Sequence, residues 1–202
     1  MTQSKPITLP LTDDVIDGLT IGDHVSFTGV IYTARDAAHK RLIELADRGE
    51  PLPLDLHGQV IYYVGPTPPR EGMVIGSAGP TTAMRLDPYT PRMLELGIKG
   101  IIGKGGRGPV VREALVKHHA IYCIAVGGTG ALLNRHIKSA EVVAFEDLGT
   151  EAIRRLEVED FPAIVVNDCR GGDLLEEGKK QYRTSDRPIP VVKGLADGGG
   201  GR

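Results

Sequence analysis

The amino-acid sequence predicts an α/β fold, and three observations support this prediction. Short apolar runs typical of strands alternate with amphipathic stretches typical of helices along most of the chain. Residues 98–126 have the pattern of a complete strand–helix–strand unit. The 202 residues suffice for one domain with a large core, or at most for two small ones.

The composition is that of an ordinary soluble globular protein, with 41% hydrophobic and 25% charged residues. The formal net charge of -2 gives no reason to expect a nucleic-acid or membrane-surface partner. No apolar run approaches the roughly 18 residues of a transmembrane helix, and Met1–Pro10 lacks the pattern of a signal peptide. We therefore expect a cytoplasmic protein.

The chain contains two cysteines, Cys123 and Cys169, which lie far apart and form no CxxC motif. This usage is typical of a reducing compartment. The apolar or strand-like flanks of both residues predict buried free thiols. Two cysteines cannot by themselves hold an iron–sulfur cluster of the usual kind.

The first half of the chain is predicted to be rich in strands. The strand-like patterns lie at residues 7–9, 24–32 and 59–64. Gly29 interrupts the second of these patterns, which predicts a bulge or a close approach of another backbone. Between the second and third patterns, the sequence favours a helix that opens at Thr33, runs to Arg48 and ends at Gly49.

Arg35 lies in the first turn of that predicted helix, where a cation opposes the helix dipole. His39 follows one turn later on the same face. Two interpretations remain open for this pair. Arg35 is either an anion-binding residue held at a strand-to-helix junction or part of a solvated basic helix face.

The stretch Ser77–Asp87 combines a Gly-Pro turn, two adjacent hydroxyls and an arginine. The apolar run Met73–Ile75 predicts a strand leading into it, and Pro80 suits the first position of a helix. A helical turn there would place Thr81 and Arg85 on one face, with backbone N–H groups and guanidinium directed at one spot. That arrangement would bind a carboxylate or phosphate. The alternative is a capped helix with a surface arginine.

The second half is predicted to continue the alternation of helices and strands. Thr90 and Pro91 form a strong helix start, with threonine as the cap and proline at the first position. The predicted elements are helices over 92–96, 109–119 and 131–136, strands over 98–102, 120–126, 141–145 and 161–168, and a helical turn over 151–156.

The loop Gly103–Gly108 satisfies the pattern GxGxxG, but this match is weak support for a dinucleotide site. The acidic residue expected about 20 positions later is missing, and so is the GK[ST] ending of a triphosphate loop. What remains is a group of backbone N–H groups and Lys104 that would attract an anion. His118 and His119 end the following helix, and a metal role for them lacks a third ligand in the sequence.

Three motifs in order, rather than any single one, carry a resemblance to a known family. They are Gly79-Pro80-Thr81-Thr82-Ala83-Met84-Arg85, the earlier Arg35-Asp36-Ala37-Ala38-His39 and the later Ile102-Gly103-Lys104-Gly105. With them the chain resembles the β subunit of iron–sulfur class I hydro-lyases, the two-subunit class I fumarases and L-tartrate dehydratases. The similarity runs from about Thr8 to Tyr182, including residues 147–152 and 157–162.

The resemblance implies a swivelling β/β/α layered domain with a mixed sheet. It also implies the reversible addition of water across the double bond of a dicarboxylate. The 4Fe–4S cluster would be held by three cysteines of a partner α subunit, which agrees with the shortage of cysteines in this chain. We expect residues 1–185 to form this domain, αβ pairs to assemble into a higher oligomer, and residues 186–202 to form a flexible tail.

The resemblance also implies roles for individual residues. Arg35, Arg85 and Lys104 would hold the substrate carboxylates, and Thr81 matches the threonine proposed as the base. Thr82 would donate a hydrogen bond to the substrate or the loop. Three readings therefore stay open: a fumarate hydratase subunit, which is the commoner activity, a dehydratase subunit for tartrate or a methylated dicarboxylate, and a non-catalytic anion-binding or assembly module.

Overall fold

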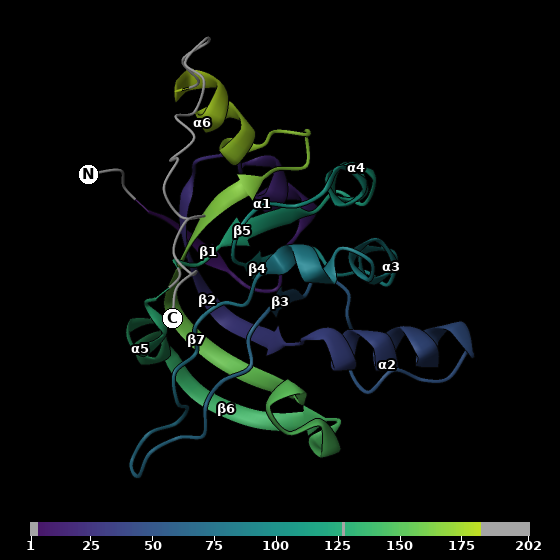
Figure 1. The fold of residues 1–202 in the computed structure, drawn as a ribbon, viewed down its shortest axis with the longest axis vertical. Helices are drawn as coiled ribbons and strands as arrows, with labels where there is room; N and C mark the ends of the chain where they lie inside the picture. The colour runs from purple at the N-terminus through teal and green to yellow at the C-terminus, as the bar shows by residue number, and fades with distance from the viewer. Residues whose placement is uncertain (1–3, 127, 183–202) are drawn as a thin grey trace, which may run out of the picture.

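A computed structural model of the protein describes residues 4–126 and 128–182 (Figure 1). The predicted tail, residues 186–202, lies outside the described residues. The strands are β1 (Lys5–Thr8), β2 (His24–Thr33), β3 (Val60–Tyr62), β4 (Gly100–Gly103), β5 (Ile121–Ile124), β6 (Ile137–Ala144) and β7 (Ile153–Asn167). The helices are α1 (Asp13–Asp17), α2 (Asp36–Asp47), α3 (Thr90–Glu95), α4 (Pro109–Lys117), α5 (Gly130–Leu133) and α6 (Leu174–Tyr182), with 3-10 turns η1 (Ala83–Leu86), η2 (Asn134–His136) and η3 (Glu146–Glu151).

The seven strands form one mixed sheet in the order β1-β2-β3-β4-β5-β7-β6. Neighbours from β1 to β5 are parallel, whereas β7 runs antiparallel to β5, β6 and β2. Because β7 pairs with both β5 and β2, the strands β2, β3, β4, β5 and β7 close into a barrel-like ring. The mixed α/β fold class predicted from the sequence is confirmed.

Two apolar cores explain the layers of the fold. Alternate residues of a strand point to opposite faces, so Tyr62 and Ile102 face the core enclosed by the ring. Their neighbours Ile61, Tyr63 and Ile101 face the second core, between the ring and the helices. A strand buried on both faces needs a continuous apolar run rather than an alternating one, which β3 and β4 both have.

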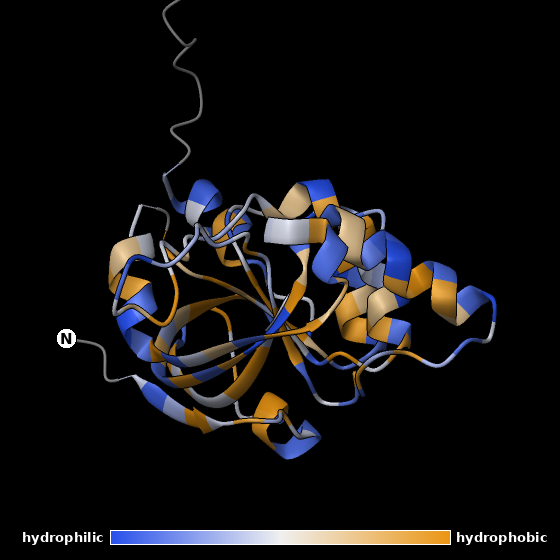
Figure 2. Ribbon diagram, turned by 90° about the horizontal axis from the view of Figure 1, so that it is seen from below, coloured by the Kyte–Doolittle hydropathy of each residue, from blue (hydrophilic) through white to orange (hydrophobic). Residues whose placement is uncertain are grey.

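Helices α2, α3 and α4 stack along one side of the sheet, and α5 lies on the other side (Figure 1). Ala38 and Leu42 of α2 and Leu115 of α4 are fully buried in the second core. Figure 2 shows the sheet curling round beside these helices, with hydrophobic residues along its strands. No helix of the described residues is long and apolar enough to cross a membrane.

Several predicted features occur in the structure. The strand–helix–strand unit is present as β4, α4 and β5, with the two strands parallel and adjacent. Gly29 lies at a register shift between β2 and β7 with a φ of 131°. A Cβ at Gly29 would also lie 3.0 Å from the Cβ of Leu9, so the bulge and the close approach both occur.

Other predictions at the start of elements are wrong. Residues 73–75 form no strand, because Met73 and Val74 are 43% and 49% exposed and offer no buried face to a sheet. No helix begins at Pro80, and the first helical turn is η1, three residues later. Thr90 is the first residue of α3 rather than its cap, because its hydroxyl donates to the Leu86 carbonyl.

The helical turn predicted over 151–156 is also wrong. The helical turn η3 ends at Glu151, and Ile153 begins the long strand β7, which also contains the strand predicted over 161–168. Pairing with β2 on one edge and β6 on the other overrides the local sequence preference there. The terminal helix α6 was not predicted from the sequence.

Candidate functional site

The predicted site residues gather at the carboxyl ends of three parallel strands. Arg35 follows β2 by two residues, and Lys104 follows β4 directly. Between these strands lies β3, and its continuation reaches Gly65. Because parallel strands end at the same edge of a sheet, segments remote in sequence meet there, as ligand sites in α/β sheets commonly do.

The segment that carries the two threonines is inserted between β3 and β4 just beyond the point where these strands pair. The Thr81 N–H donates to the Tyr63 carbonyl over 2.7 Å, and the Lys104 N–H donates to the Thr81 carbonyl over 3.1 Å. The Ala83 N–H donates back to the Lys104 carbonyl, so Thr82 and Lys104 form a parallel bridge. The backbone thereby fixes both threonines beside Lys104.

Arg85 reaches the same edge from η1. Its Nε donates to Oδ1 of Asp36 over 3.0 Å, which joins it to the residue after Arg35. Among the residues that the structure describes, this is the ion pair recorded for Arg85, whose side chain is 49% exposed. The guanidinium is therefore accessible from solvent.

The Arg35 side chain is less exposed than that of Arg85, at 21%. Its Nη2 lies 3.4 Å from Oε1 of Glu151, and its side chain crosses directly over Gly65. A Cβ at Gly65 would lie 2.8 Å from Nη1, so a side chain there would displace the guanidinium. Oε2 of Glu151 accepts the Ala37 N–H, which ties Arg35 to the start of α2.

This geometry corrects the sequence analysis in two respects. Arg35 precedes the helix as an extended N-cap residue, so it is not in the first turn. Thr81 and Arg85 do not share a helix face, because Thr81 is part of the bridge between β3 and β4. The backbone N–H of Thr81 is used in that bridge and is not free to bind an anion. The predicted residues meet by strand topology instead of helical spacing.

Arg107 supports the loop that presents Lys104, and its side chain is fully buried. Its Nε donates to Oδ1 of Asp87 over 2.8 Å, and the other oxygen of Asp87 accepts the Gly108 N–H. The guanidinium also lies over the rings of Tyr63 and Tyr122, at 5.4 and 5.0 Å from their centroids. Burial alone would lower the pKa of Arg107, but Tyr63 and Asp87 outweigh it, and the pKa is raised. This buried cation therefore stays charged and anchors the glycine loop.

His39 is fully buried below Arg35 and is not part of a solvated basic face. Its Nδ1 lies 2.8 Å from the Arg35 carbonyl, and its ring meets the Tyr63 ring edge-on at 5.2 Å between centroids. Burial lowers the pKa of His39 to about 4, and the nearby charge of Arg107 acts in the same direction. His39 is therefore neutral at pH 7 and holds the backbone of Arg35.

The assembled site can bind anions. It places three cationic side chains and two hydroxyls at one edge, with Asp36 and Glu151 as internal counter-charges. Lys104, Thr82 and Arg85 are exposed, so the site is open to solvent on one side. Glu151, Asp87 and Arg107 could not be recognised from the sequence, because each contributes only through contacts between distant segments.

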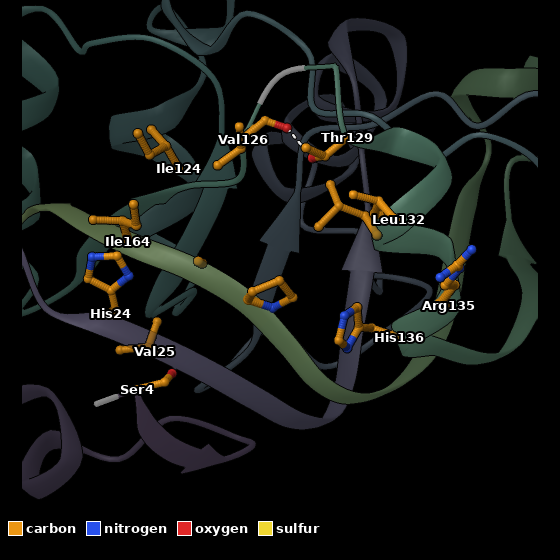
Figure 3. Close-up of a pocket in the computed structure, with 13 residues that line it drawn as sticks. Ser4, His24, Val25, Ile124, Val126, Thr129, Leu132, Arg135, His136 and Ile164 are labelled. Carbon is orange, nitrogen blue, oxygen red and sulfur yellow. Dashed lines mark hydrogen bonds between the residues drawn. The ribbon is translucent and has the colours of Figure 1, made fainter. Parts of the chain in front are cut away.

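A separate cavity of about 520 Å³ lies between α5 and the strands β2 and β7 (Figure 3). Apolar side chains such as Ile124, Leu132 and Ile164 line it, with His24 and His136 among them. None of the five predicted site residues lines this cavity. The candidate site is thus an exposed edge of the sheet rather than a closed pocket.

The thiols of this chain do not suit an iron–sulfur cluster. Cys123 and Cys169 are both free and buried, as predicted from the sequence. A 4Fe–4S cluster takes three or four cysteine ligands, more than this chain contains. Burial raises the pKa of the Cys123 thiol well above its usual range, which favours an inert core residue.

The fold and site together define a class of protein: a barrel-like α/β domain with a cluster of arginine and lysine side chains at the carboxyl edge of its parallel strands. Comparison with known proteins identifies the family of this chain. The family described as "Fumarase C-terminus" matches residues 2–178. The chain belongs to this family.

Relatives of two kinds are similar to the chain. It is 42% identical over 156 residues to "Fumarate hydratase 2" of Leishmania major, covering 76% of this chain and 28% of that protein. It is 41% identical over 159 residues to "Fumarate hydratase class I, aerobic" of Salmonella typhimurium, covering 78% and 27%. The chain therefore spans little more than a quarter of these proteins. It is 33% identical to "L(+)-tartrate dehydratase subunit beta" of Escherichia coli, covering 96% of both chains.

Replacement of Arg107 is expected to destabilise the protein strongly. In Arg107→Ala the carboxylate of Asp87 loses a buried partner, which costs about 3–5 kcal/mol of unfolding free energy in comparable cases. Urea denaturation measures this loss. Arg48→Ala serves as the control, because Arg48 pairs with Glu50 on the exposed surface and its loss should change little. Equal effects of both substitutions would refute the anchoring role.

The free energy of unfolding is expected to decrease as the pH is lowered, because His39 is buried in its neutral form. Its pKa is about 4 in the folded protein and near 6.5 in the unfolded chain, so the unfolded chain binds more protons between these values. The contribution is fully present above pH 6.5 and is lost as the pH falls toward 4, by about 3 kcal/mol in all. Urea denaturation at several pH values would show this slope. It should flatten in His39→Asn, and an unchanged slope would contradict the assignment.

Proposed function

We propose that this chain is the β subunit of a 4Fe–4S hydro-lyase that interconverts fumarate and L-malate. The observation that carries the proposal is the convergence of Arg35, Arg85, Lys104, Thr81 and Thr82 at one open edge. A dianionic substrate needs fixed cations at both ends, and this edge provides three. Membership of the family and the names of its relatives support the same chemistry.

In this proposal the cations bind and orient the two carboxylates of the substrate. Arg85 is half exposed on the turn that follows the threonines, while Arg35 is less exposed and is held by Glu151. Lys104 comes from the opposite side of the threonine segment through the bridge to Thr82. Cations on both sides of the threonines would fix a dicarboxylate across them.

Thr81 is proposed to remove the proton from the carbon beside one carboxylate. A threonine hydroxyl is a weak base, so it needs adjacent positive charge, which Arg85 and Lys104 supply. Its backbone N–H and carbonyl are both bonded within the sheet, which fixes the backbone that carries the hydroxyl. Thr82 is proposed to donate a hydrogen bond to the substrate. The same cations would stabilise the charge that develops when the proton leaves.

The reaction also removes a hydroxide ion, and this chain offers no group for that step among the predicted site residues. We propose that a 4Fe–4S cluster on an α subunit supplies Lewis acidity for it. The open edge of the site would then face that subunit, and αβ pairs would assemble further in the cytoplasm. The subunit designation of the tartrate dehydratase relative supports a partner of this kind.

A second candidate function is the dehydration of L-tartrate or of a methylated dicarboxylate. The coverage favours it, because the chain matches almost the whole length of a tartrate dehydratase β subunit. The higher identity to fumarate hydratases favours the first candidate. Both substrates carry two carboxylates, so the same cations would bind either.

The test combines the purified chain with its cluster-bearing α subunit under anaerobic conditions. Loss of fumarate is followed, with tartrate and mesaconate in parallel. We expect fumarate turnover in the mixture and none from either chain alone. Turnover of another diacid would retain the mechanism and change the substrate. If an intact cluster is verified and no diacid reacts, the chain is an anion-binding or assembly module.

Within that assay, Arg85→Ala is expected to lose turnover by roughly a hundredfold or more, because the carboxylate loses a charged donor. The substitution removes one exposed ion pair, so folding and assembly with the α subunit should persist. Arg92→Ala is the matched control, since Arg92 is an exposed, ion-paired arginine on α3. Full activity of Arg85→Ala would refute the role given to Arg85.

A further inference from the structure

Three potential metal ligands meet at the other edge of the sheet. Asp17 ends α1, His119 follows α4, and Cys169 follows β7. One side-chain atom of each residue lies within 4.8 Å of the others. Asp17 and His119 precede the parallel strands β2 and β5, and Cys169 follows the antiparallel β7. The cluster therefore lies at the amino ends of the parallel strands, opposite the anion site.

His119 is held with its ring directed into this cluster. Its Nε2 lies 3.4 Å from Oδ1 of Asp17, and this nitrogen is buried without a hydrogen-bond partner among the described residues. The backbone of His119 has a φ of 52°, a conformation that glycine or asparagine usually adopts at a helix end. The Lys99 ammonium donates to the His119 carbonyl and fixes this turn.

Cys169 is held in the same rigid way. It is 7% exposed and free. The next residue, Arg170, donates from Nη1 to the Leu19 carbonyl and from Nη2 to the Asp17 carbonyl. The preceding Asp168 accepts the N–H groups of Arg170 and Gly172. Hydrogen bonds on both sides of Cys169 therefore fix it next to the end of α1.

We propose that Asp17, His119 and Cys169 form a binding site for a divalent cation of the zinc type. Sulfur, imidazole nitrogen and carboxylate oxygen are the three ligand types that zinc takes. In a tetrahedral site the nitrogen and oxygen ligands lie about 3.3 Å apart, close to the 3.4 Å between Asp17 and His119. A water molecule would complete the four ligands.

The charges of the site balance when the cation binds. The thiol of Cys169 loses its proton to solvent, so one thiolate, one carboxylate and a neutral imidazole surround two positive charges. Burial raises the pKa of the Cys169 thiol, with Asp168 and Asp17 adding to the rise against the opposing charge of Arg170. The cation itself must therefore displace the proton, as bound metals do with thiols.

Such a site would be structural, because it joins three segments that are remote in sequence and far from the proposed catalytic edge. A cation bound there would link α1, the turn after α4 and the end of β7. This proposal for a cation site does not depend on the proposed hydro-lyase reaction. A cation that binds only the folded chain stabilises it by RT ln(1 + [L]/Kd), so the unfolding temperature should rise with the logarithm of cation concentration above Kd.

The test titrates the purified full chain, freed of metal under reducing conditions, with Zn²⁺ in a calorimeter and with Co²⁺ in a spectrophotometer. We expect one Zn²⁺ per chain and a thiolate-to-cobalt charge-transfer band. Cys169→Ser should abolish that band, and His119→Asn should weaken binding by roughly tenfold or more. Asparagine suits the left-handed backbone at position 119, so the fold should persist.

Two matched variants control this experiment. Cys123→Ser removes the other buried thiol, and His118→Asn removes the adjacent histidine, and neither should change binding. Circular dichroism verifies that each variant is folded. Zn²⁺ binding that survives both Cys169→Ser and His119→Asn would overturn the proposal. So would a cobalt complex of the unmodified chain without the thiolate band, because the sulfur ligand would then be absent.

Discussion

The insertion of residues 81–83 between β3 and β4 is the constraint on which the candidate site depends. Two parallel strands normally continue their hydrogen bonds to each other, but here a third segment bonds the Tyr63 carbonyl and both backbone groups of Lys104. Both strands must diverge to admit it, and Gly103 is needed because a Cβ there would lie 3.0 Å from the Cβ of Ala83. The positions of the threonines, Lys104 and Arg85 all follow from this one insertion.

Polar residues buried in the core next to the inserted segment stabilise it. Arg107 and Asp87 hold the glycine loop to the end of η1, and His39 holds the backbone of Arg35. His39 and Arg107 pack on the ring of Tyr63, whose carbonyl bonds Thr81. Charged and polar groups in such a core are costly unless paired, so the contacts of Arg107 with Asp87 and of His39 with the Arg35 carbonyl offset the cost of their burial.

Local patterns in the sequence predicted most elements but not how they meet. The unit β4–α4–β5 and the bulge at Gly29 follow from periodicity and glycine placement, and the structure contains both. The helix expected at Pro80 is absent because hydrogen bonds to Tyr63 and Lys104 decide the backbone there. The strand expected at 73–75 is absent because Met73 and Val74 are exposed and offer no buried face to a sheet. Local patterns marked Arg35, Thr81, Arg85 and Lys104 as anion-binding candidates, and the family motifs assigned roles to them and to Thr82. Glu151 and Arg107 could be found only once distant segments were placed together.

An open site explains why the chain requires a partner in the proposed function. Arg85 is half exposed, and charges at such a surface are weakened by water and salt. Strong discrimination of a transition state requires that water be excluded from these charges. The cavity between α5 and β7 lies elsewhere and contains none of the site residues. A second polypeptide covering the carboxyl edge would exclude water and so strengthen the attraction between the three cations and a bound dianion. The proposed α subunit would therefore strengthen substrate binding as well as supply the cluster.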